Sequence, residues 1–484
     1  MYIARLCVLA LTVGPVLAAC DEGARSPGTG GASSSTSSSA TTVSTATSGS
    51  VSSSAVTSAS VSATSSSASS TGSSASASSG DAGLEDIVMN IGVGLQIMDG
   101  FGAADTWMGT LTTAQADLFF SPTAGIGLSI LRVGIDENGN DLAPYANAKM
   151  AAARGAIVWG APWSPPAASK DNGNIDNGGH LLADDYGTWA ATLAGFAAKM
   201  QQNAGVQLYG ISAQNEPDFT ASYASCVYSG DEMLAFVKVL GPALKALDPP
   251  VKLLAAEPDV WSDLWGGSNA YGTAICDDAD ASASVDVLAV HQYANGAVTA
   301  PPEGITQHIW ETEASGVRGS LQAGPSADIA NGIAVAQWIH DAIVIGGASA
   351  WHYWWLISLN NDNEGLLAQG GGMTKRLYTM GNFSKFVRPG YQRVATSGPA
   401  PPGVSLSAYT DPVSLQVVVV AINSNSDATT LPVYVSASTV PAQVTPWVTS
   451  ASTDLAAQAA IAVVGGRFVA TLPGQSVTTF VSTP

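Results

Sequence analysis

The sequence predicts an α/β protein, a (β/α)8 TIM barrel with an attached antiparallel β-sandwich side domain. One observation is a series of eight short apolar or β-branched runs with helical or loop segments between them, which is typical of this barrel. The other is a change of pattern in residues 396–484, where strand-like runs are separated by Pro, Asn, Asp and Gly and helical periodicity is absent. Short segments also fit an open α/β sheet, but the count of eight favours the barrel.

The predicted elements follow in chain order from residue 88, where the composition becomes that of a globular protein. The eight barrel strands are expected at 96–103, 128–135, 155–161, 207–214, 251–257, 285–291, 307–313 and 349–355. One helix between them is clear, because five apolar side chains at helical spacing form one stripe. These are Tyr186, Trp189, Leu193, Phe196 and Met200. Side-domain strands are expected at 404–409, 414–422, 430–435, 443–449 and 467–471.

Residues 1–20 are interpreted as an export signal, with Arg5 as its basic start and an apolar stretch over residues 6–17. The stretch is too short and too interrupted by Pro and Gly for a membrane-spanning helix. The residues Leu-Ala-Ala-Cys at 17–20 resemble a bacterial lipobox, in which Cys20 becomes the lipidated N-terminus. The alternative is an ordinary cleaved signal with an incidental cysteine. We therefore expect an exported protein, held at a membrane or cell surface through lipid alone, or secreted.

Residues 21–87 are predicted to be a disordered tether. Between 24 and 82 the chain is almost entirely Ser, Ala, Thr, Gly and Val, and no aromatic residue occurs there to nucleate a core. Behind an anchored Cys20, such a segment would hold a catalytic domain away from a surface. The predicted domains are therefore 88–395 for the barrel and 396–484 for the β-sandwich.

Charge and cysteine usage exclude some partners. The chain has 17 basic and 37 acidic residues and a formal net charge of −20, so it repels phosphate backbones, and nucleic acid is not an expected partner. The 5 histidines are scattered, so a metal site is not expected. No cofactor is expected, and the protein is expected to be a monomer.

Cys226 and Cys276 lie in the globular part, and export to an oxidising compartment predicts a disulfide between them. The alternative is two buried free thiols.

Two carboxylates follow predicted barrel strands at their C-terminal ends, from which catalytic groups project in this fold. Glu216 follows the fourth strand and Glu313 ends the seventh, across the barrel, so their side chains can converge over its mouth. Hydrolysis of a glycosidic bond needs such a pair, because one carboxylic acid protonates the leaving oxygen and one carboxylate acts at the anomeric carbon. A separation of ~5–5.5 Å would give retention through a covalent intermediate.

Polar and aromatic side chains near these acids are candidates for substrate binding. Asn215 is expected to bond the sugar 2-hydroxyl, and Arg132, which offers a fixed fork of donors, is expected to orient a carboxylate at the mouth. Four aromatic side chains are candidates for stacking on a sugar ring, with core packing as the rival interpretation of each. They are Trp107, Trp163, Tyr293 and Trp355.

Eight stretches resemble glycoside hydrolase family 30, and the resemblance extends over essentially all of the globular chain. They are DGFGAADTW at 99–107, LRVGIDEN at 131–138, GAIVWGAPWSPP at 155–166, LYGISAQNEPDF at 208–219, HQY at 291–293, WETE at 310–313, KRLYTMGNFSKFVRPGY at 375–391 and PGQSVTTFV at 473–481. Within the family, the set is most similar to the bacterial xylanase subgroup often called glucuronoxylanases. The resemblance implies that Glu216 is the acid/base and Glu313 the nucleophile, and that a few residues before the first barrel strand join the β-sandwich.

Two other acids lie close to these positions. Glu311 lies two residues before Glu313, so both point to the same face of a strand, and the resemblance favours Glu313 as the nucleophile. Glu311 is interpreted as a structural acid. Glu257 follows the fifth predicted strand and is interpreted in the same way.

One departure from the subgroup bears on the substrate. The subgroup typically carries a pair of arginines after strand eight that recognise a glucuronic acid branch of xylan. Residues 354–362, WWLISLNND, contain no Arg or Lys and contain Asp362. A branch carboxylate would find no bidentate partner there. The resemblance therefore implies a retaining endo-β-1,4-xylanase that acts on plant cell-wall xylan without requiring the branch.

Two alternatives stay open. One is another β-glycanase of family 30, such as an endo-β-1,6-galactanase or a β-glucanase, because specificity depends on loop shape. The other is a non-catalytic carbohydrate-binding lipoprotein. Loss of either Glu216 or Glu313 would have favoured the second alternative, and both residues are present.

Overall fold

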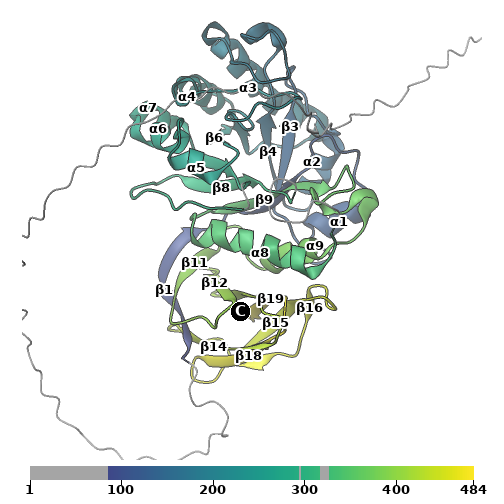
Figure 1. The fold of residues 1–484 in the computed structure, drawn as a ribbon, viewed down its shortest axis with the longest axis vertical. Helices are drawn as coiled ribbons and strands as arrows, with labels where there is room; N and C mark the ends of the chain where they lie inside the picture. The colour runs from purple at the N-terminus through teal and green to yellow at the C-terminus, as the bar shows by residue number, and fades with distance from the viewer. Residues whose placement is uncertain (1–84, 294–295, 317–325, 484) are drawn as a thin grey trace, which may run out of the picture. The chain divides into compact units, whose positions relative to one another are not determined.

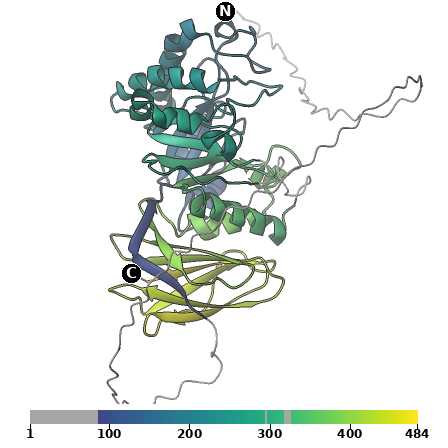
Figure 2. The same cartoon turned by 60° about the vertical axis from the view of Figure 1, so that its left-hand side comes forward.

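The computed structural model describes residues 85–293, 296–316 and 326–483, which form a barrel and a β-sheet domain within one compact unit (Figure 1, Figure 2). The predicted export signal, Cys20 and nearly all of the predicted tether lie outside the described residues. Among the residues that are described, none of the helices has the length and apolarity needed to cross a membrane.

Eight parallel strands close the barrel and confirm the predicted fold. They are β2 (Gly100–Ala104), β3 (Ile130–Ile135), β4 (Ile157–Pro162), β5 (Gly210–Ser212), β6 (Lys252–Ala256), β7 (Val287–His291), β8 (His308–Glu313) and β9 (Ala350–Ile357). Neighbours in chain order are paired, and the ring closes because β9 pairs with both β8 and β2. Each predicted barrel run overlaps one of these strands. A further short strand, β10 (Gly365–Leu367), pairs with β9 outside the ring.

Helices separate most of the barrel strands, although none of the described residues between β7 and β8 is helical. The helices are α1 (Thr113–Phe120), α2 (Tyr145–Ala152), α3 (Tyr186–Ala204), α4 (Gly230–Lys245), α5 (Trp261–Trp265), α6 (Tyr271–Asp277), α7 (Ala279–Ser284), α8 (Ile329–Val344) and α9 (Lys375–Ser384). The predicted stripe of five apolar residues on α3 is buried throughout. The helix ends at Gly205, whose φ of 69° is left-handed and is readily adopted by glycine. The start of α4 is fixed by a capping box between Ser229 and Glu232.

The side domain is a mostly antiparallel sheet of ten strands. They are β1 (Ile87–Ile97), β11 (Gln392–Ser397), β12 (Val404–Thr410), β13 (Val417–Asn423), β14 (Thr429–Ser436), β15 (Gln443–Thr449), β16 (Ala456–Ala457), β17 (Ile461–Ala462), β18 (Arg467–Leu472) and β19 (Ser476–Ser482). Strand β1 pairs with β11 in antiparallel and with β14 in parallel orientation, so residues before the barrel complete this domain. The domain change predicted between 395 and 396 falls inside β11.

Helices α8 and α9 lie between the barrel and the side domain (Figure 1). The amide of Asn382 on α9 donates to Trp447 O at 2.9 Å and to Thr479 Oγ1 at 3.0 Å, and the Thr479 hydroxyl donates back to Asn382 O at 2.6 Å. All three bonds are at least partly buried and join residues far apart in sequence. The side domain is therefore attached to the outside of the barrel through α8 and α9, the helices that follow β8 and β9 in the chain.

The predicted disulfide between Cys226 and Cys276 is wrong, since both thiols are free. Cys226 is buried in the loop after the C-terminal end of β5. Cys276 lies on α6, where its Sγ is 3.8 Å from Oε1 of Gln307, directly before the N-terminal end of β8. The two side chains are thus associated with opposite ends of barrel strands, although the strands that precede them are neighbours in the ring.

Candidate active site

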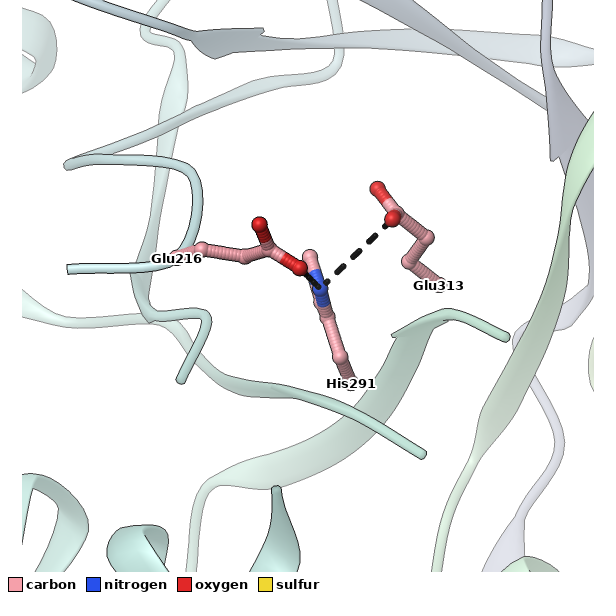
Figure 3. A group of neighbouring side chains, drawn as sticks. All are labelled: Glu216, His291 and Glu313. Atoms are coloured by element: carbon pink, nitrogen blue, oxygen red, sulfur yellow. Dashed lines mark ion pairs between the residues drawn. The ribbon is translucent and has the colours of Figure 1, made fainter. Parts of the chain in front are cut away.

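The C-terminal ends of β5, β7 and β8 bring three ionisable side chains together. Glu216 follows β5, His291 ends β7 and Glu313 ends β8. A carboxylate oxygen of each Glu and a ring nitrogen of the His all lie within 4.8 Å of one another. Figure 3 shows the two carboxylates turned toward each other with the His291 ring beside both. The two acids predicted from sequence therefore do converge at the mouth.

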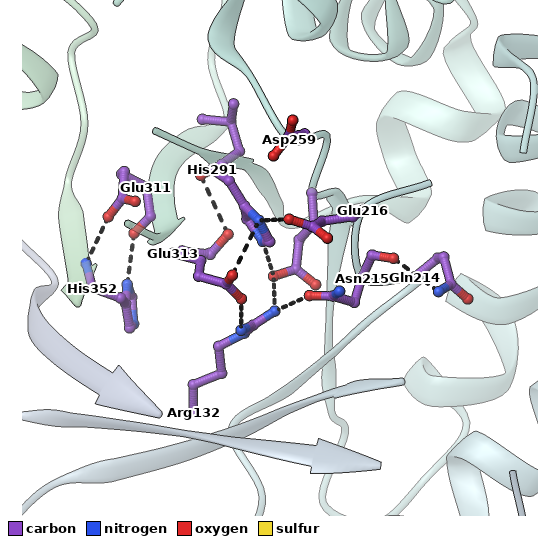
Figure 4. Close-up of polar contacts among 12 residues, drawn as sticks. Arg132, Gln214, Asn215, Glu216, Asp259, His291, Glu311, Glu313 and His352 are labelled. Carbon is purple, nitrogen blue, oxygen red and sulfur yellow. Dashed lines mark hydrogen bonds and ion pairs between the residues drawn. The ribbon is translucent and has the colours of Figure 1, made fainter. Parts of the chain in front are cut away.

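An irregularity in strand pairing aims Glu313 at this group. Val290 of β7 pairs with Glu311 of β8, but the next residue, His291, pairs with Glu313, so β8 carries one extra residue. Such a bulge redirects a side chain and is frequent beside active sites. Glu311 instead accepts a hydrogen bond from the backbone N–H of His352 at 2.7 Å (Figure 4). Burial raises the pKa of Glu311 well above its ordinary value, in keeping with a structural acid.

Glu313 is held by two donors. Its Oε1 accepts a hydrogen bond of 2.6 Å from the Tyr293 hydroxyl, and its Oε2 accepts one from Nη1 of the fully buried Arg132. The other guanidinium nitrogen, Nη2, donates to Asn215 Oδ1 at 2.5 Å (Figure 4). Charge-assisted bonds of this kind favour an ionised, oriented carboxylate. Arg132 thus occupies the orienting position predicted for it, and Tyr293 contacts a carboxylate at the mouth.

Glu216 is fixed by backbone contacts on both sides of its strand end. Asn215 N donates to Pro162 O at 3.0 Å, and Glu216 N donates to Glu257 O at 3.1 Å. The φ of Glu216 is 44°, a left-handed value that a non-glycine residue adopts at some cost and that is concentrated at functional sites. This conformation turns the side chain, which is buried, toward His291 rather than along the strand.

His291 and Glu257 complete the charged group, and the sequence did not single out either as part of a site. Nδ1 of His291 lies 3.4 Å from Glu216 Oε1 and 3.8 Å from Glu313 Oε1, while Nε2 lies 3.5 Å from Glu257 Oε1. Glu257 Oε1 is also 3.1 Å from Arg132 Nη2. These His291 separations are ion-pair distances and lack hydrogen-bond geometry. The one signal in the sequence for His291 was its place at the end of a predicted strand, in the stretch HQY.

Electrostatics makes His291 a cation. Burial acts to lower its pKa, but the charge of Glu313 and the nearby Glu216 and Glu257 outweigh burial and raise the pKa to about 10. Burial acts to raise the pKa of Glu257, but Arg132 and His291 outweigh it, so that pKa lies below its ordinary value. Metal ligation requires a neutral imidazole. The spacing of Glu216, His291 and Glu313 would suit an ion, and an ion bound there would have to displace the His291 proton.

Five aromatic side chains cluster beside the acids. Trp107 is the centre, with its ring centroid 5.5 Å from that of Trp163, 5.9 Å from Tyr223, 6.1 Å from Trp354 and 6.5 Å from Trp355. Trp107 and Tyr223 are about 40% exposed, whereas the other three are buried. Trp163 and Trp355 therefore mainly support the exposed pair. Tyr223 was not predicted, because it lies in a loop with no periodic pattern.

Comparisons with known proteins agree with this geometry. Residues 131–313 match the model of the glycosyl hydrolase family 30 TIM-barrel domain. The chain is 33% identical over 411 residues to the glucuronoxylanase XynC of Bacillus subtilis, which covers 82% of this chain and 91% of that protein.

Solved structures show the same likeness. A family 30 subfamily 8 xylanase from Clostridium acetobutylicum is 31% identical, with a TM-score of 0.71 over 82% of this chain and 100% of that one. A family 30 endoxylanase from Clostridium papyrosolvens is 31% identical, with a TM-score of 0.69 over 83% and 100%. From the identity, its coverage and the matched barrel, this chain belongs to glycoside hydrolase family 30.

Proposed function

We propose that this protein is a retaining endo-β-1,4-xylanase that does not require a glucuronic acid branch. The observation that supports the two-carboxylate mechanism is that an oxygen of Glu216 and an oxygen of Glu313 lie within 4.8 Å of each other. Carboxyl groups ~5–5.5 Å apart act with retention and wider pairs with inversion, so this close approach favours retention.

The contacts of Glu313 and Glu216 support a different catalytic role for each acid. Glu313, which accepts from Arg132 and Tyr293, is suited to be the ionised nucleophile. In the first step its oxygen bonds to the anomeric carbon, the glycosidic C–O bond breaks, and the proton of Glu216 passes to the leaving oxygen. In the second step Glu216 takes a proton from water, the water oxygen bonds to the same carbon, and the Glu313 carboxylate is released.

Xylan is proposed as the substrate because relatives that are 31–33% identical over nearly their whole length are xylanases by name. Fold alone does not choose the glycan, since a structure described as an endo-β-1,6-glucanase shares the fold with a TM-score of 0.62 at 20% identity. Another β-glycan therefore stays the second candidate.

Independence from a glucuronic acid branch is inferred from the loop after β9. Asp362 in that loop accepts hydrogen bonds from the Ser358 hydroxyl and, at 3.0 Å, from Glu364 N. Within the described part of the chain, Arg376 is a cation whose charge interacts with Asp362, and it is buried and uses Nε and Nη1 on Gly365 O, Ser326 O and Asn363 Oδ1. An anionic branch would thus meet an acid that is already fixed and a cation engaged beneath the surface.

The test is a product profile on linear xylan, glucuronoxylan and β-1,6-galactan, with the configuration of the new reducing end followed by NMR. The proposal expects cleavage of both xylans, with products not set by branch position and with the β configuration formed first. Cleavage of glucuronoxylan alone would refute branch independence. Cleavage of galactan but neither xylan would replace the substrate, and an initial α product would refute retention.

A further inference from the structure

Trp107 has a backbone conformation that the surrounding structure must maintain. It lies in the loop after β2, its φ is 63°, and its side chain is 40% exposed. A left-handed conformation is costly for a bulky residue and persists only where neighbouring contacts determine it. The aromatic neighbours of Trp107 contact its ring, and one of them, Trp355, also bonds the backbone of the loop. The other contacts that hold the loop come from buried polar side chains.

Asn147 on α2 supplies several of these contacts through its amide, and the residue is fully buried. Its Nδ2 donates to Asp105 Oδ2 at 3.0 Å and to Gly109 O at 3.1 Å, and its Oδ1 accepts from Leu111 N at 2.8 Å. One side chain thus binds the loop on both sides of Trp107. An amide is suited to this task because it offers donors and an acceptor at the same point.

Asp105 anchors the other side of the loop to the barrel. Its backbone N–H donates to Arg132 O at 3.2 Å, and its carbonyl accepts from Met108 N at 2.8 Å, which closes a tight turn around Trp107. The side chain is fully buried, and burial raises its pKa to about 7. Trp355 reinforces the same turn, since its Nε1 donates to Thr106 O at 2.9 Å.

We propose that Asn147 and Asp105 are positioning residues that hold Trp107 as the sugar-stacking platform and so determine how tightly the glycan binds. Both are too deeply buried to touch substrate, and they act through Trp107. The inference rests on the proposed function, because it requires a sugar ring on the exposed face of Trp107.

A double-mutant cycle in the full-length protein tests this proposal. kcat and KM would be measured on the glycan that the wild type cleaves, for N147A, W107A and the double variant. We expect each single substitution to raise KM about tenfold, with a smaller change in kcat. In the W107A background, N147A should raise KM less than about twofold, because the platform it positions is already gone.

A matched control separates positioning from general destabilisation. Asn382 is also a fully buried asparagine with two donated hydrogen bonds, but it joins α9 to the side domain. N382A should lower Tm to a similar extent as N147A and leave KM unchanged. If N147A does not fold, D105A and D105N replace it. D105A should raise KM, and D105N, which keeps an acceptor for Asn147, should recover most of the loss.

The inference would be overturned if N147A raised KM equally in the wild-type and W107A backgrounds, or if N147A lowered only kcat. It would also be overturned if N382A raised KM as much as N147A does. For the D105 pair, equal KM values in D105A and D105N would do the same. A wild type that cleaves no β-glycan would instead refute the proposed function, so the two failures are distinct.

Discussion

Nε2 of His291 lies 3.5 Å from Oε1 of Glu257, on the side of the ring opposite to Glu216 and Glu313. This pair places a fully buried acid behind the imidazole, where it cannot reach a substrate but can influence the charge of the ring. Arg132 supplies the second cation of this group, because its two terminal nitrogens pair with Glu257 and Glu313.

Replacing Glu257 with Gln should lower the pKa of His291 from about 10, because one of the three carboxylates that outweigh its burial loses its charge. A fall of about one pH unit or more in the titration midpoint is expected. Nitrogen-15 NMR of labelled histidine would follow it. Glu311→Gln is the control, because Glu311 is likewise fully buried but its carboxylate bonds the backbone N–H of His352. An unchanged midpoint in E257Q would refute this influence.

Glu216→Gln and Glu313→Gln should each lower kcat on the glycan by at least about 100-fold, with folding intact. The two variants should differ on an aryl glycoside with a good leaving group, which needs no protonation. E216Q should form its intermediate rapidly on that substrate, whereas E313Q should stay inactive on both. Glu311→Gln should keep substantial activity. If E311Q is inactive while E313Q is active, the assignment of the nucleophile is wrong.

Asp141→Asn should stabilise the protein more at pH 8 than at pH 5. Burial, with a contribution from Asp105, raises the pKa of Asp141 to about 8, against ~3.9 in an unfolded chain. The unfolded state therefore binds fewer protons between these values, and stability contributed by this site falls as pH rises toward 8. The variant should remove at least about 1 kcal/mol of that loss.

Denaturant unfolding of wild type and D141N at pH 5 and pH 8 would measure this difference. Asp184→Asn, at an exposed position before α3, is the control and should leave the pH dependence of stability as in the wild type. Equal effects of D141N at both pH values would show that Asp141 is ionised throughout.

Thiol titration should find one reactive cysteine in the folded domain and two after denaturation without reductant. Cys226 is buried, and burial raises the pKa of its thiol to about 12, so almost no thiolate forms at pH 8. Cys276 is only partly buried and should react slowly. No reactive thiol in the denatured, unreduced domain would indicate that the two cysteines are bonded after all.

Cys20→Ser should convert a protein that fractionates with membranes into a soluble one, if Cys20 carries the lipid proposed from the lipobox-like residues 17–20. Fractionation followed by immunoblotting would show it, with enzyme activity as a control for folding of the catalytic domain. Membrane association that persists in the variant would contradict a lipid anchor at this position.

The barrel and the positions of the two acids at its mouth could be predicted from the sequence. Strand-forming runs and their C-terminal ends are local features, so eight runs located the eight strands, and Glu216 and Glu313 followed from their places at strand ends. The membership of β1 in the side domain was implied by the resemblance to family 30 and is observed. The stripe on α3 was likewise visible because helical periodicity is written in consecutive residues.

How those parts meet depends on contacts that form only in the folded chain. The bulge in β8, which separates Glu313 from Glu311, depends on pairing with β7 and leaves no local signature. Tyr223 joins Trp107 from a distant loop, and Asn147 reaches the Trp107 loop from α2. Cys226 and Cys276 remain apart because they lie near opposite ends of the barrel strands, although the strands that precede them are neighbours in the ring. Each of these outcomes is a contact between segments far apart in the chain, which composition and periodicity do not encode.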